Sequence, residues 1–394
     1  MIKVAWMVPN TPAWTGGLHY FINLASALLA WPERRIEPII LGDTSTLPEP
    51  LRSLASVPSV SDVKKYSARW WLLRLNRIFS SKGSIQARIF KQHDIKLFSH
   101  GGPLGSRSTI PSLCWIPDFQ HKHLPLMFNE AEITARDRGF TDVAQKAKAV
   151  LLSSADAEKD FRQFFPQAVG KTYVLRFVAA PPPCGKDTSE VLSRYDITEP
   201  YFHIPNQLWR HKNHTLVLEA LRLLRDSGTC PLIVSTGQTD DYRHPAYFAD
   251  LRRQVTEAGL AERFRFLGLI DFNYVGALMH SAMAIINPSR FEGWSTTVEE
   301  AKSLGKRLLL SDIPVHREQA PERGLYFGVD DAEALADLIR QTKDEYSPAE
   351  EEEARQKAKA ALPGRMLDFA KSYENIVLEV LAKHSILTRP SVGE

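Results

Sequence analysis

The residues best suited to chemistry lie in the segment NPSRFEGWSTTVEEAKSLG, residues 287–305. It joins a short apolar run, MAIINPS, to a stretch with helical spacing that starts near Ser295. A loop of small polar residues that leads directly into a helix presents free backbone amides along the helix dipole, and this geometry binds phosphate. The expected donors are the amides of Gly293, Trp294, Ser295 and Thr296 and the hydroxyls of Ser295, Thr296 and Thr297.

Two carboxylates flank this expected anion site. Glu292 precedes the helix, and Glu300 follows eight residues later inside it. Because an ionised carboxylate only accepts hydrogen bonds and vicinal sugar hydroxyls donate them, a carboxylate at each end of a diphosphate suits a nucleotide sugar. The alternative is that Ser295 or Thr296 is an ordinary N-cap and that Glu299 and Glu300 are charges on the helix surface. The segment alone supports both interpretations equally.

The elements that must position these residues follow an α/β pattern. Residues 2–8 are a short apolar run that is typical of a buried parallel strand. A loop with two glycines, a stretch of helical spacing and a second apolar run follow, which together predict a βαβ unit. Further strand-like runs stand at residues 94–102, 111–118, 147–154 and 172–178. We therefore predict a first doubly wound domain over residues 1–178.

A second domain begins after a proline cluster, Pro181 to Pro183, which cannot lie inside a regular element. We predict a linker over 179–190, a second doubly wound domain over 191–362, and a C-terminal helix over 363–394 that packs back on the first domain. The acidic run Glu350 to Glu353 before that helix is expected to be a solvated face. The strand-like runs of the second domain are residues 201–206, 230–237, 263–270, 283–289 and 306–312.

Composition limits the classes of protein to which this chain can belong. Its 394 residues carry 49 lysines and arginines against 46 aspartates and glutamates, and 44% of them are hydrophobic, which is typical of a globular protein of about two domains. Its three cysteines form no Cys-x-x-Cys, which argues against a disulfide framework and against a cysteine-built zinc site. The N-terminus is typical of a first strand rather than a signal peptide, and no apolar window is long enough for a transmembrane helix. We expect a cytoplasmic protein.

The motif Pro-Ser-x-x-Glu-Gly, with Glu292 and Glu300 as a spaced pair before an alanine, resembles the signature of the retaining glycosyltransferases of family 4. Residues 205–221 resemble the segment that supplies the diphosphate-binding arginine and lysine of this family. Lys212 matches the lysine, whereas Asn206 stands in the arginine position, so the arginine's role is either lost or taken by Arg210. Independently of the resemblance, a loop with several basic residues suits a diphosphate leaving group, and a solvated surface loop is the alternative.

Other parts of the chain resemble the same family. Gly16 and Gly17 resemble its N-terminal glycine pair, and residues 147–161 match the strand and helix entry that end its first domain. Asp118 matches an aspartate that usually follows a histidine, but Pro117 stands in the histidine position. The candidates to replace that histidine are His121 and His123, and a structural role in the loop is an equal alternative for both.

The resemblance implies a GT-B fold, in which two Rossmann-like domains face each other across a cleft. It implies a metal-independent hexosyltransferase, which fits the absence of any Asp-x-Asp, with a nucleotide-diphosphate sugar as donor substrate and no other cofactor. The implied reaction moves the sugar to a glycan or lipid-linked acceptor, as in surface polysaccharide or glycolipid synthesis. The implied site residues are Lys212, Glu292 and Arg210 for catalysis, Glu300, Gly293, Trp294, Ser295, Thr296, Asn206, Gly16 and Gly17 for the donor, and Asp118 and His121 on the acceptor side. The base is expected near residues 268–272.

Residues 63–93 carry eight lysines and arginines and no acidic residue, interleaved with tryptophan, leucine and phenylalanine. This pattern predicts an interfacial element that sits on anionic lipid, at the inner face of the cytoplasmic membrane. Nucleic-acid binding is a rival that no recognised module supports. An equal alternative is that the tryptophans belong to a core and the basic residues to its solvated edge.

Other activities fit the same architecture. A GT-B nucleotide-sugar epimerase or a sugar phosphorylase shares it, and so does a non-catalytic nucleotide-sugar-binding protein. The departures at Asn206 and Pro117 favour the non-catalytic alternative, whereas Lys212, Glu292 and Glu300 oppose it. An NAD-dependent oxidoreductase is disfavoured because no Gly-x-Gly-x-x-Gly follows a predicted strand.

Overall fold

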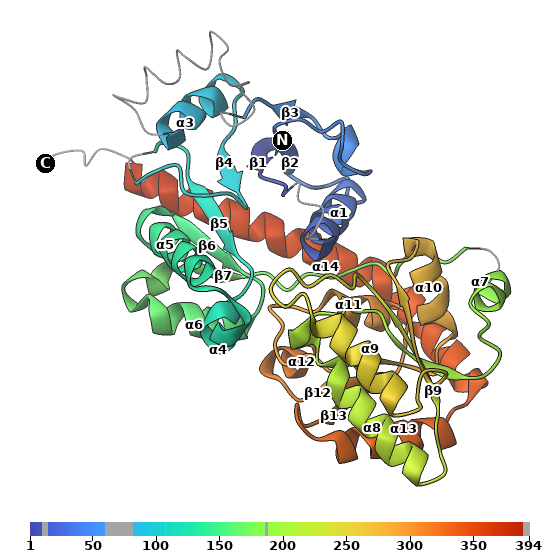
Figure 1. The fold of residues 1–394 in the computed structure, drawn as a ribbon. Coiled ribbons are helices and arrows are strands. Elements are labelled where there is room, and N and C mark those ends of the chain that lie inside the picture. The colour runs from blue at the N-terminus through green and yellow to red at the C-terminus, as the bar shows by residue number, and fades with distance from the viewer. Residues whose placement is uncertain (10–14, 60–81, 107, 186–187, 389–394) are drawn as a thin grey trace, which may run out of the picture. The chain divides into compact units, whose positions relative to one another are not determined.

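The chain forms two α/β units, each built on a parallel sheet (Figure 1). The computed structural model describes residues 1–9, 15–59, 82–106, 108–185 and 188–388. The first unit comprises Met1–Phe119, Thr134–Phe177 and Gly364–Glu394, and the second comprises Gln120–Ile133 and Val178–Pro363. The two predicted doubly wound domains are confirmed. The units differ from the predicted ranges, because residues 120–133 and the predicted linker 179–190 both group with the second unit.

Among the described residues, the sheet of the first unit has seven parallel strands in the order β3-β2-β1-β4-β5-β6-β7. They are β1 (Ile2–Trp6), β2 (Ile36–Leu41), β3 (Ser56–Val57), β4 (Leu97–Ser99), β5 (Ser112–Ile116), β6 (Ala149–Leu152) and β7 (Thr172–Val174). The helices are α1 (Thr15–Leu29), α3 (Lys82–Gln92), α5 (Glu130–Lys146), α6 (Ala155–Phe164), the 3-10 helices η1 (Leu51–Ser53) and η4 (Pro166–Lys171), and the last part of α14 (Pro348–Thr388).

Helices cover both faces of this sheet. Successive side chains of a strand point to opposite faces, so neighbouring residues of β1 contact different helices. On β1, Ala5 packs in one cluster with Phe90 of α3. The next residue, Trp6, faces the other way, where its ring contacts Phe21 of α1 and its Nε1 donates to the hydroxyl of Tyr373 of α14 at 2.7 Å. The first unit is therefore covered by α1 and α14 on the face that Trp6 meets and by α3 on the opposite face.

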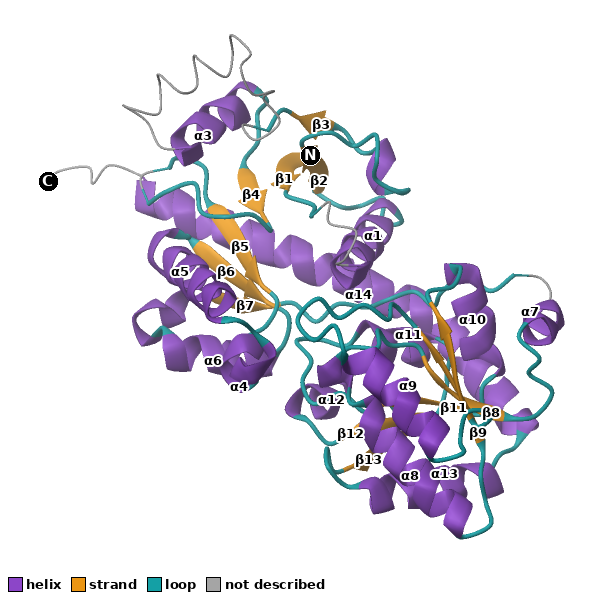
Figure 2. Ribbon diagram, in the orientation of Figure 1, coloured by secondary structure: helices purple, strands orange, loops and turns teal. Residues whose placement is uncertain are grey.

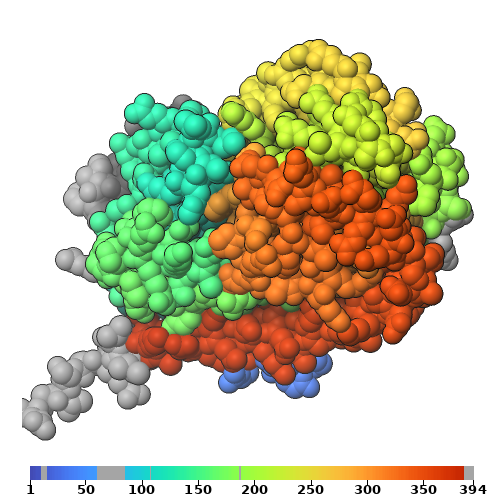
Figure 3. All heavy atoms as spheres, turned by 90° about the horizontal axis from the view of Figure 1, so that it is seen from below, coloured from blue at the N-terminus to red at the C-terminus, as the bar shows by residue number. Residues whose placement is uncertain are grey.

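The last helix, α14, differs from its prediction. It begins at Pro348 rather than near residue 363 and continues for 41 residues through Pro363 (red in Figure 3). Its Glu374 accepts from the backbone N and the Nε of Arg35 at 2.6 and 2.8 Å and is buried in the first unit. The prediction of a solvated acidic face is wrong for Glu351, which pairs with Lys306 at 2.9 Å and with Arg323.

The described residues of the second unit form a six-stranded parallel sheet in the order β10-β9-β8-β11-β12-β13. Its strands are among those drawn in orange in Figure 2. The strands are β8 (Tyr201–Ile204), β9 (Leu232–Thr236), β10 (Phe264–Gly268), β11 (Ala284–Asn287), β12 (Leu308–Ser311) and β13 (Gly324–Phe327). The helices are α4 (Gln120–His123), α7 (Thr188–Arg194), α8 (His214–Asp226), α9 (Tyr247–Glu257), α10 (Phe272–Ser281), α11 (Thr296–Ser303), α12 (Pro314–Gln319), α13 (Ala332–Asp344) and the 3-10 helices η3 (Pro125–Met127) and η5 (Arg210–Lys212).

The core of the second unit consists of one apolar layer on each face of its sheet. Residues of α8, α9 and α13 pack together on one face, among them Leu216, Leu251 and Leu335. Residues of α7, α10 and α11 pack on the other face, among them Val191 and Val298. The central strands β8, β9, β11 and β12 are buried throughout, as expected for a parallel sheet between two helical layers.

The strand order has a switch point in the second unit, because β8 lies beside β11 and the chain winds away from this pair in both directions. In open α/β sheets, ligands bind beyond the carboxyl ends of the strands at such a point. The segments that leave β8 and β11 there are residues 205–213 and 288–295. These are the two segments in which the sequence predicted the chemistry.

Candidate functional site

The helix predicted to follow the loop 287–295 is confirmed. Ser295 is the N-cap of α11, and its hydroxyl accepts from the backbone N–H of Val298. The short apolar run before the loop is β11, whose carboxyl end is at Asn287. The loop therefore connects the carboxyl end of a central strand to a helix N-terminus, which is the arrangement that suits an anion.

Two predicted catalytic residues meet at this switch point. Nζ of Lys212, at the end of η5, lies 2.6 Å from Oε1 of Glu292, and their side chains are 15% and 10% exposed. Burial alone would raise the pKa of Glu292, but the Lys212 ammonium, the His316 ring and hydrogen bonds from Lys212 and Ser289 hold it below its ordinary value. Glu292 is thus an ionised carboxylate at neutral pH, ready to accept hydrogen bonds.

The carboxylates of α11 are buried, so the interpretation of Glu299 and Glu300 as surface charges is wrong. Glu299 is 1% exposed and accepts from Nζ of Lys302 and from Nε2 of Gln319, both at 3.0 Å. Glu300 is 7% exposed, and burial raises its pKa to about 8. A carboxyl group with that pKa is mostly protonated at neutral pH. A pKa raised by burial is common among functional carboxyl groups.

A buried network of hydrogen bonds joins the ends of the two strands. Nδ2 of Asn206, which follows β8, donates to Oδ1 of Asn287 at the end of β11 at 2.9 Å. The Thr297 hydroxyl of α11 donates to Oδ1 of Asn206 at 2.8 Å, and Nδ2 of Asn287 donates to the Ser295 hydroxyl at 2.9 Å. Both ends of the Asn206 amide therefore bond to the protein. Asn206 ties the segment after β8 to the segment that carries Glu292, and its predicted contact with the donor remains a prediction.

Two of the predicted anion donors already bond to other groups of the protein. The amide of Ser295 donates to Oε1 of Gln319 at 3.2 Å, and the role of Ser295 in binding the donor remains a prediction. The Thr297 hydroxyl is used by Asn206, as described above. Gly293 and Thr296 are partly exposed, and Trp294 is buried. The role of these three residues in binding an anion remains a prediction.

The helix α12 contributes residues that sequence reasoning missed. Gln319 clamps the start of α11, since its Nε2 also donates to the Ser295 carbonyl at 2.9 Å. His316 is fully buried, and its Nδ1 lies 2.9 Å from the Ser311 carbonyl, which can only accept, so Nδ1 carries the proton. Burial lowers the pKa of His316 although Glu292 opposes this shift. No motif in the sequence signals that these side chains reach back to the loop.

Arg210 and the two candidate histidines have different surroundings. The Arg210 side chain is exposed, as an available cation of the loop should be. His121 is 1% exposed in α4, whereas the exposed ring of His123 stacks on Phe291 with the ring centroids 5.2 Å apart. Phe291 directly precedes Glu292, so His123 is the candidate that lies beside this loop. Which of the two replaces the histidine missing at Pro117 remains a prediction.

Two predictions concern the first unit. Gly16 and Gly17 lie in the first turn of α1 rather than in a loop, because that helix begins at Thr15. Asp118 lies 3.7 Å from Nη1 of Arg136. The roles of all three residues in binding remain predictions. Of the predicted lipid-binding segment, residues 63–81 lie outside the described residues.

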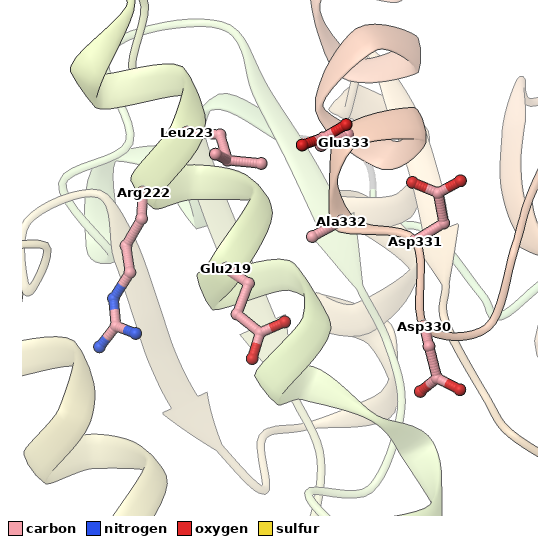
Figure 4. A pocket seen from close by; sticks show the side chains of 7 residues that line it. All are labelled: Glu219, Arg222, Leu223, Asp330, Asp331, Ala332 and Glu333. Carbon is pink, nitrogen blue, oxygen red and sulfur yellow. The ribbon is translucent and has the colours of Figure 1, made fainter.

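A hollow of about 530 Å³ lies elsewhere in the second unit, between α8 and the start of α13 (Figure 4). Its lining is mainly acidic, so it would repel a phosphate and is not the candidate site. It is lined by Glu219, Arg222, Leu223, Asp330, Asp331, Ala332 and Glu333. Across the described part of the chain, no group of three or more histidine, cysteine, aspartate or glutamate residues could hold a metal ion.

Comparisons with known proteins point to one family. Residues 193–361 match the model of the glycosyl transferases group 1. The chain is 30% identical over 142 residues to the O-antigen chain mannosyltransferase RfbU of Salmonella typhimurium, a match that covers 36% of this chain and 38% of that protein. It is 29% identical over 98 residues to the lipopolysaccharide core biosynthesis mannosyltransferase LpsB of Rhizobium meliloti, which covers 24% of this chain and 27% of that protein.

The fold is similar over almost the whole chain to that of a solved glycosyltransferase from Rickettsia africae. The TM-score is 0.67 with 16% identity, and the superposition covers 99% of both chains. The curated relatives, in contrast, are matched over less than half of their own lengths. The chain therefore has the GT-B fold, and its residues 193–361 are similar to the glycosyl transferases group 1.

Proposed function

We propose that this protein is a retaining, metal-independent hexosyltransferase. It transfers a sugar from a nucleoside diphosphate to a glycan or lipid-linked acceptor during surface polysaccharide or glycolipid synthesis. The observation that carries the proposal is the pairing of Lys212 with Glu292 at the switch point of the second sheet, with the buried Glu300 in the adjoining helix. The names of the two mannosyltransferase relatives favour mannose as the sugar and a lipopolysaccharide or O-antigen chain as the product.

Lys212 and Glu292 have separate roles at the bond between the sugar and the diphosphate. An ammonium group has three donors, so Lys212 can keep its bond to Glu292 and also donate to a phosphate oxygen. The negative charge that develops on the departing diphosphate is then stabilised by a cation that is already in place. Glu292 keeps acceptor capacity for a hydroxyl of the sugar. Arg210, exposed in the same turn, supplies a second cation.

Glu300 binds the ribose in this proposal. The two hydroxyls of a ribose are donors, and an ionised carboxylate accepts from both. Burial keeps Glu300 largely protonated in the free protein, with its pKa raised to about 8, so hydrogen bonds from the ribose favour its ionisation. The base then lies near Leu269, which follows β10 and is 77% exposed.

The acceptor side of the proposal involves a membrane surface. Within the described residues, no helix has the length and apolar character to span a bilayer. The basic and aromatic residues of the segment 63–93 would instead hold the enzyme at anionic lipid on the cytoplasmic face, where a lipid-linked acceptor is met. Flotation with phosphatidylglycerol vesicles at low salt tests this point. Loss of the protein from the vesicle fraction would contradict it.

One observation favours a second candidate, a non-catalytic nucleotide-sugar-binding protein. The position of the diphosphate-binding arginine holds Asn206, which carries no charge and whose amide bonds to Asn287 and Thr297. An epimerase would use the same donor site, and a phosphorylase shares the architecture. Product analysis with and without an acceptor distinguishes these activities, since an epimerase turns over a nucleotide sugar alone and a phosphorylase forms a sugar phosphate.

Thermal unfolding against a panel of nucleotides and nucleotide sugars, with and without magnesium, tests the donor site. A ligand at a hundred times its dissociation constant adds about 2.7 kcal/mol to the free energy of unfolding. We expect stabilisation by one family of nucleoside diphosphates, with the same shift in the presence of a chelator. Retention of configuration is then read from the anomeric signal of the product by NMR.

A further inference from the structure

The loop that follows β9 carries a buried ion pair that the proposed function does not use. Oδ1 of Asp241 lies 3.4 Å from Nε of Arg243, and their side chains are 2% and 5% exposed. Oδ1 of Asp241 also accepts from the backbone N–H of Arg243 at 3.1 Å. Burying two charges is costly, and such pairs add little stability compared with apolar residues. This pair therefore calls for an explanation other than stability.

Both members of the pair hold the basic turn of η5. Oδ2 of Asp241 accepts from the backbone N–H of Arg210 at 3.2 Å. Nη2 of Arg243 lies 3.3 Å from Nδ1 of His211. Burial lowers the pKa of His211 far below its ordinary value, and the nearby Lys212 and Arg243 add to this. The ring is therefore neutral, and its Nδ1 accepts from the guanidinium, which can only donate.

The guanidinium is also fixed by its other contacts. Nη1 of Arg243 donates to Oε1 of Gln120 at 3.2 Å, from the segment 120–133 that belongs to the second unit. Its central carbon lies 5.1 Å from the ring centroid of Trp209 and 5.0 Å from that of Phe128. A planar guanidinium held by two rings and a carboxylate has little freedom to move.

The turn itself needs such support. Within three residues it presents the cations of Arg210 and Lys212, and Arg243 lies behind it. These positive charges repel one another, and Glu292 compensates only that of Lys212 directly. The turn ends at Asn213 in the left-handed conformation with φ of 59°, before α8 begins. Asp241 supplies a fixed negative charge behind the turn, and Arg243 fixes the histidine between the two cations.

We propose that Asp241 and Arg243 are positioning residues for the diphosphate of the donor. They hold the turn of η5 so that Arg210 and Lys212 are already in place when the diphosphate arrives, and neither residue touches the substrate. This inference rests on the proposed function, in which that turn binds the diphosphate. It adds a specific consequence: the pair supports the phosphate contribution to affinity and leaves the contribution of the nucleoside unchanged.

The test compares two ligands that differ only in the diphosphate. Calorimetry measures the dissociation constants of UDP and uridine, and of GDP and guanosine, for the wild type and for Arg243→Gln, Arg243→Lys and Asp241→Asn. We expect Arg243→Gln and Asp241→Asn to weaken the binding of the diphosphate about tenfold, the loss expected for one charge-assisted hydrogen bond, and to leave nucleoside binding unchanged. Arg243→Lys keeps the positive charge but lacks the planar guanidinium and its several donors. Its loss of affinity for the diphosphate should therefore be smaller than that of Arg243→Gln.

The matched control is Arg253→Gln, which removes an arginine of the same unit from an exposed pair with Asp250. Its affinities should equal those of the wild type. Thermal unfolding of each variant is measured in parallel. An equal loss of affinity for diphosphate and nucleoside, or no loss for either, would overturn the positioning role while leaving the proposed function intact. Failure of the wild type to bind any nucleoside diphosphate would instead overturn the proposed function, and this inference with it.

Discussion

The ammonium of Lys212 lies 2.6 Å from the carboxylate of Glu292, although 80 residues separate them in the chain. One residue follows β8 and the other follows β11, and the strand order of the second sheet places these two strands side by side. The pair is therefore a product of the topology. Because both side chains are mostly buried, removing one partner leaves the other charge without compensation.

Lys212→Ala should lower the free energy of unfolding by about 3 kcal/mol, because Glu292 remains as a buried carboxylate without its cation. The double variant Lys212→Ala/Glu292→Gln should be more stable than Lys212→Ala, since it buries no unpaired charge. Turnover should fall about a hundredfold in both, because the leaving group loses its cation. Urea unfolding and initial rates measure the two effects.

The control for this cycle is Lys343→Ala, on the exposed side of α13 in the same unit. It should change the free energy of unfolding by less than about 0.5 kcal/mol. The single variant Glu292→Gln completes the cycle. If the cost of the double variant equalled the sum of the costs of Lys212→Ala and Glu292→Gln, the two side chains would not interact in solution.

Glu300 should make the stability of the protein depend on pH. Burial raises its pKa to about 8 from 4.5, so between these values the folded state holds a proton that the unfolded state has released. The free energy of unfolding therefore falls as the pH rises from 4.5 to 8, by at most about 1.4 kcal/mol per pH unit. Glu300→Gln should remove this contribution. Urea unfolding at pH 5, 6, 7 and 8 measures it, and equal slopes for the two proteins would contradict the assignment.

The same group should make ligand binding depend on pH in the opposite direction. The ribose hydroxyls donate to the ionised carboxylate, so the complex favours the form that is scarce in the free protein below pH 8. Affinity for a nucleoside should therefore rise between pH 6 and pH 8, by up to about tenfold per unit. In Glu300→Gln the affinity should be lower and should not change with pH. Calorimetry in buffers of different ionisation heat would detect the released proton.

Much of the fold could be predicted because buried parallel strands are short apolar runs with a distinct boundary. The run before Asn287 is β11, and the run that starts at Tyr201 is β8. The strands β3 and β13 were not predicted, since β3 has only two residues and β13 begins with a glycine and is only partly buried. The start of α14 at Pro348 was also missed, because the helix continues through Pro363, and an interior proline usually ends or kinks a helix.

The site could be predicted only where a residue type is tied to a fixed spacing in one segment. Glu292, Glu300 and Lys212 were predicted in this way, and the structure brings Lys212 and Glu292 into contact. Gln319 and Arg243 act across the fold on segments 24 and 32 residues away, and no local pattern reports such contacts. Asn206 could be interpreted from the sequence only as the absence of the family's arginine. In the structure its amide forms two hydrogen bonds in a buried network, with Asn287 and Thr297.

Gly237 follows β9 in a conformation that a side chain would not tolerate. Its φ is +145°, and a Cβ atom there would lie 2.4 Å from the carbonyl oxygen of Asn206. Gly237→Ala must therefore push the segment after β8 away from β9, and this segment leads to Lys212. We expect the free energy of unfolding to fall by about 2–4 kcal/mol and affinity for a nucleoside diphosphate to fall with it.

Gly228→Ala is the matched control, since Gly228 also has a positive φ, +82°, but no atom lies within 4 Å of the added Cβ. Gly228→Ala should lower the free energy of unfolding by only about 1 kcal/mol, the cost of backbone strain, and should leave the affinity unchanged. Equal effects of the two substitutions in urea unfolding and calorimetry would mean that the contact with Asn206 plays no part in holding the site.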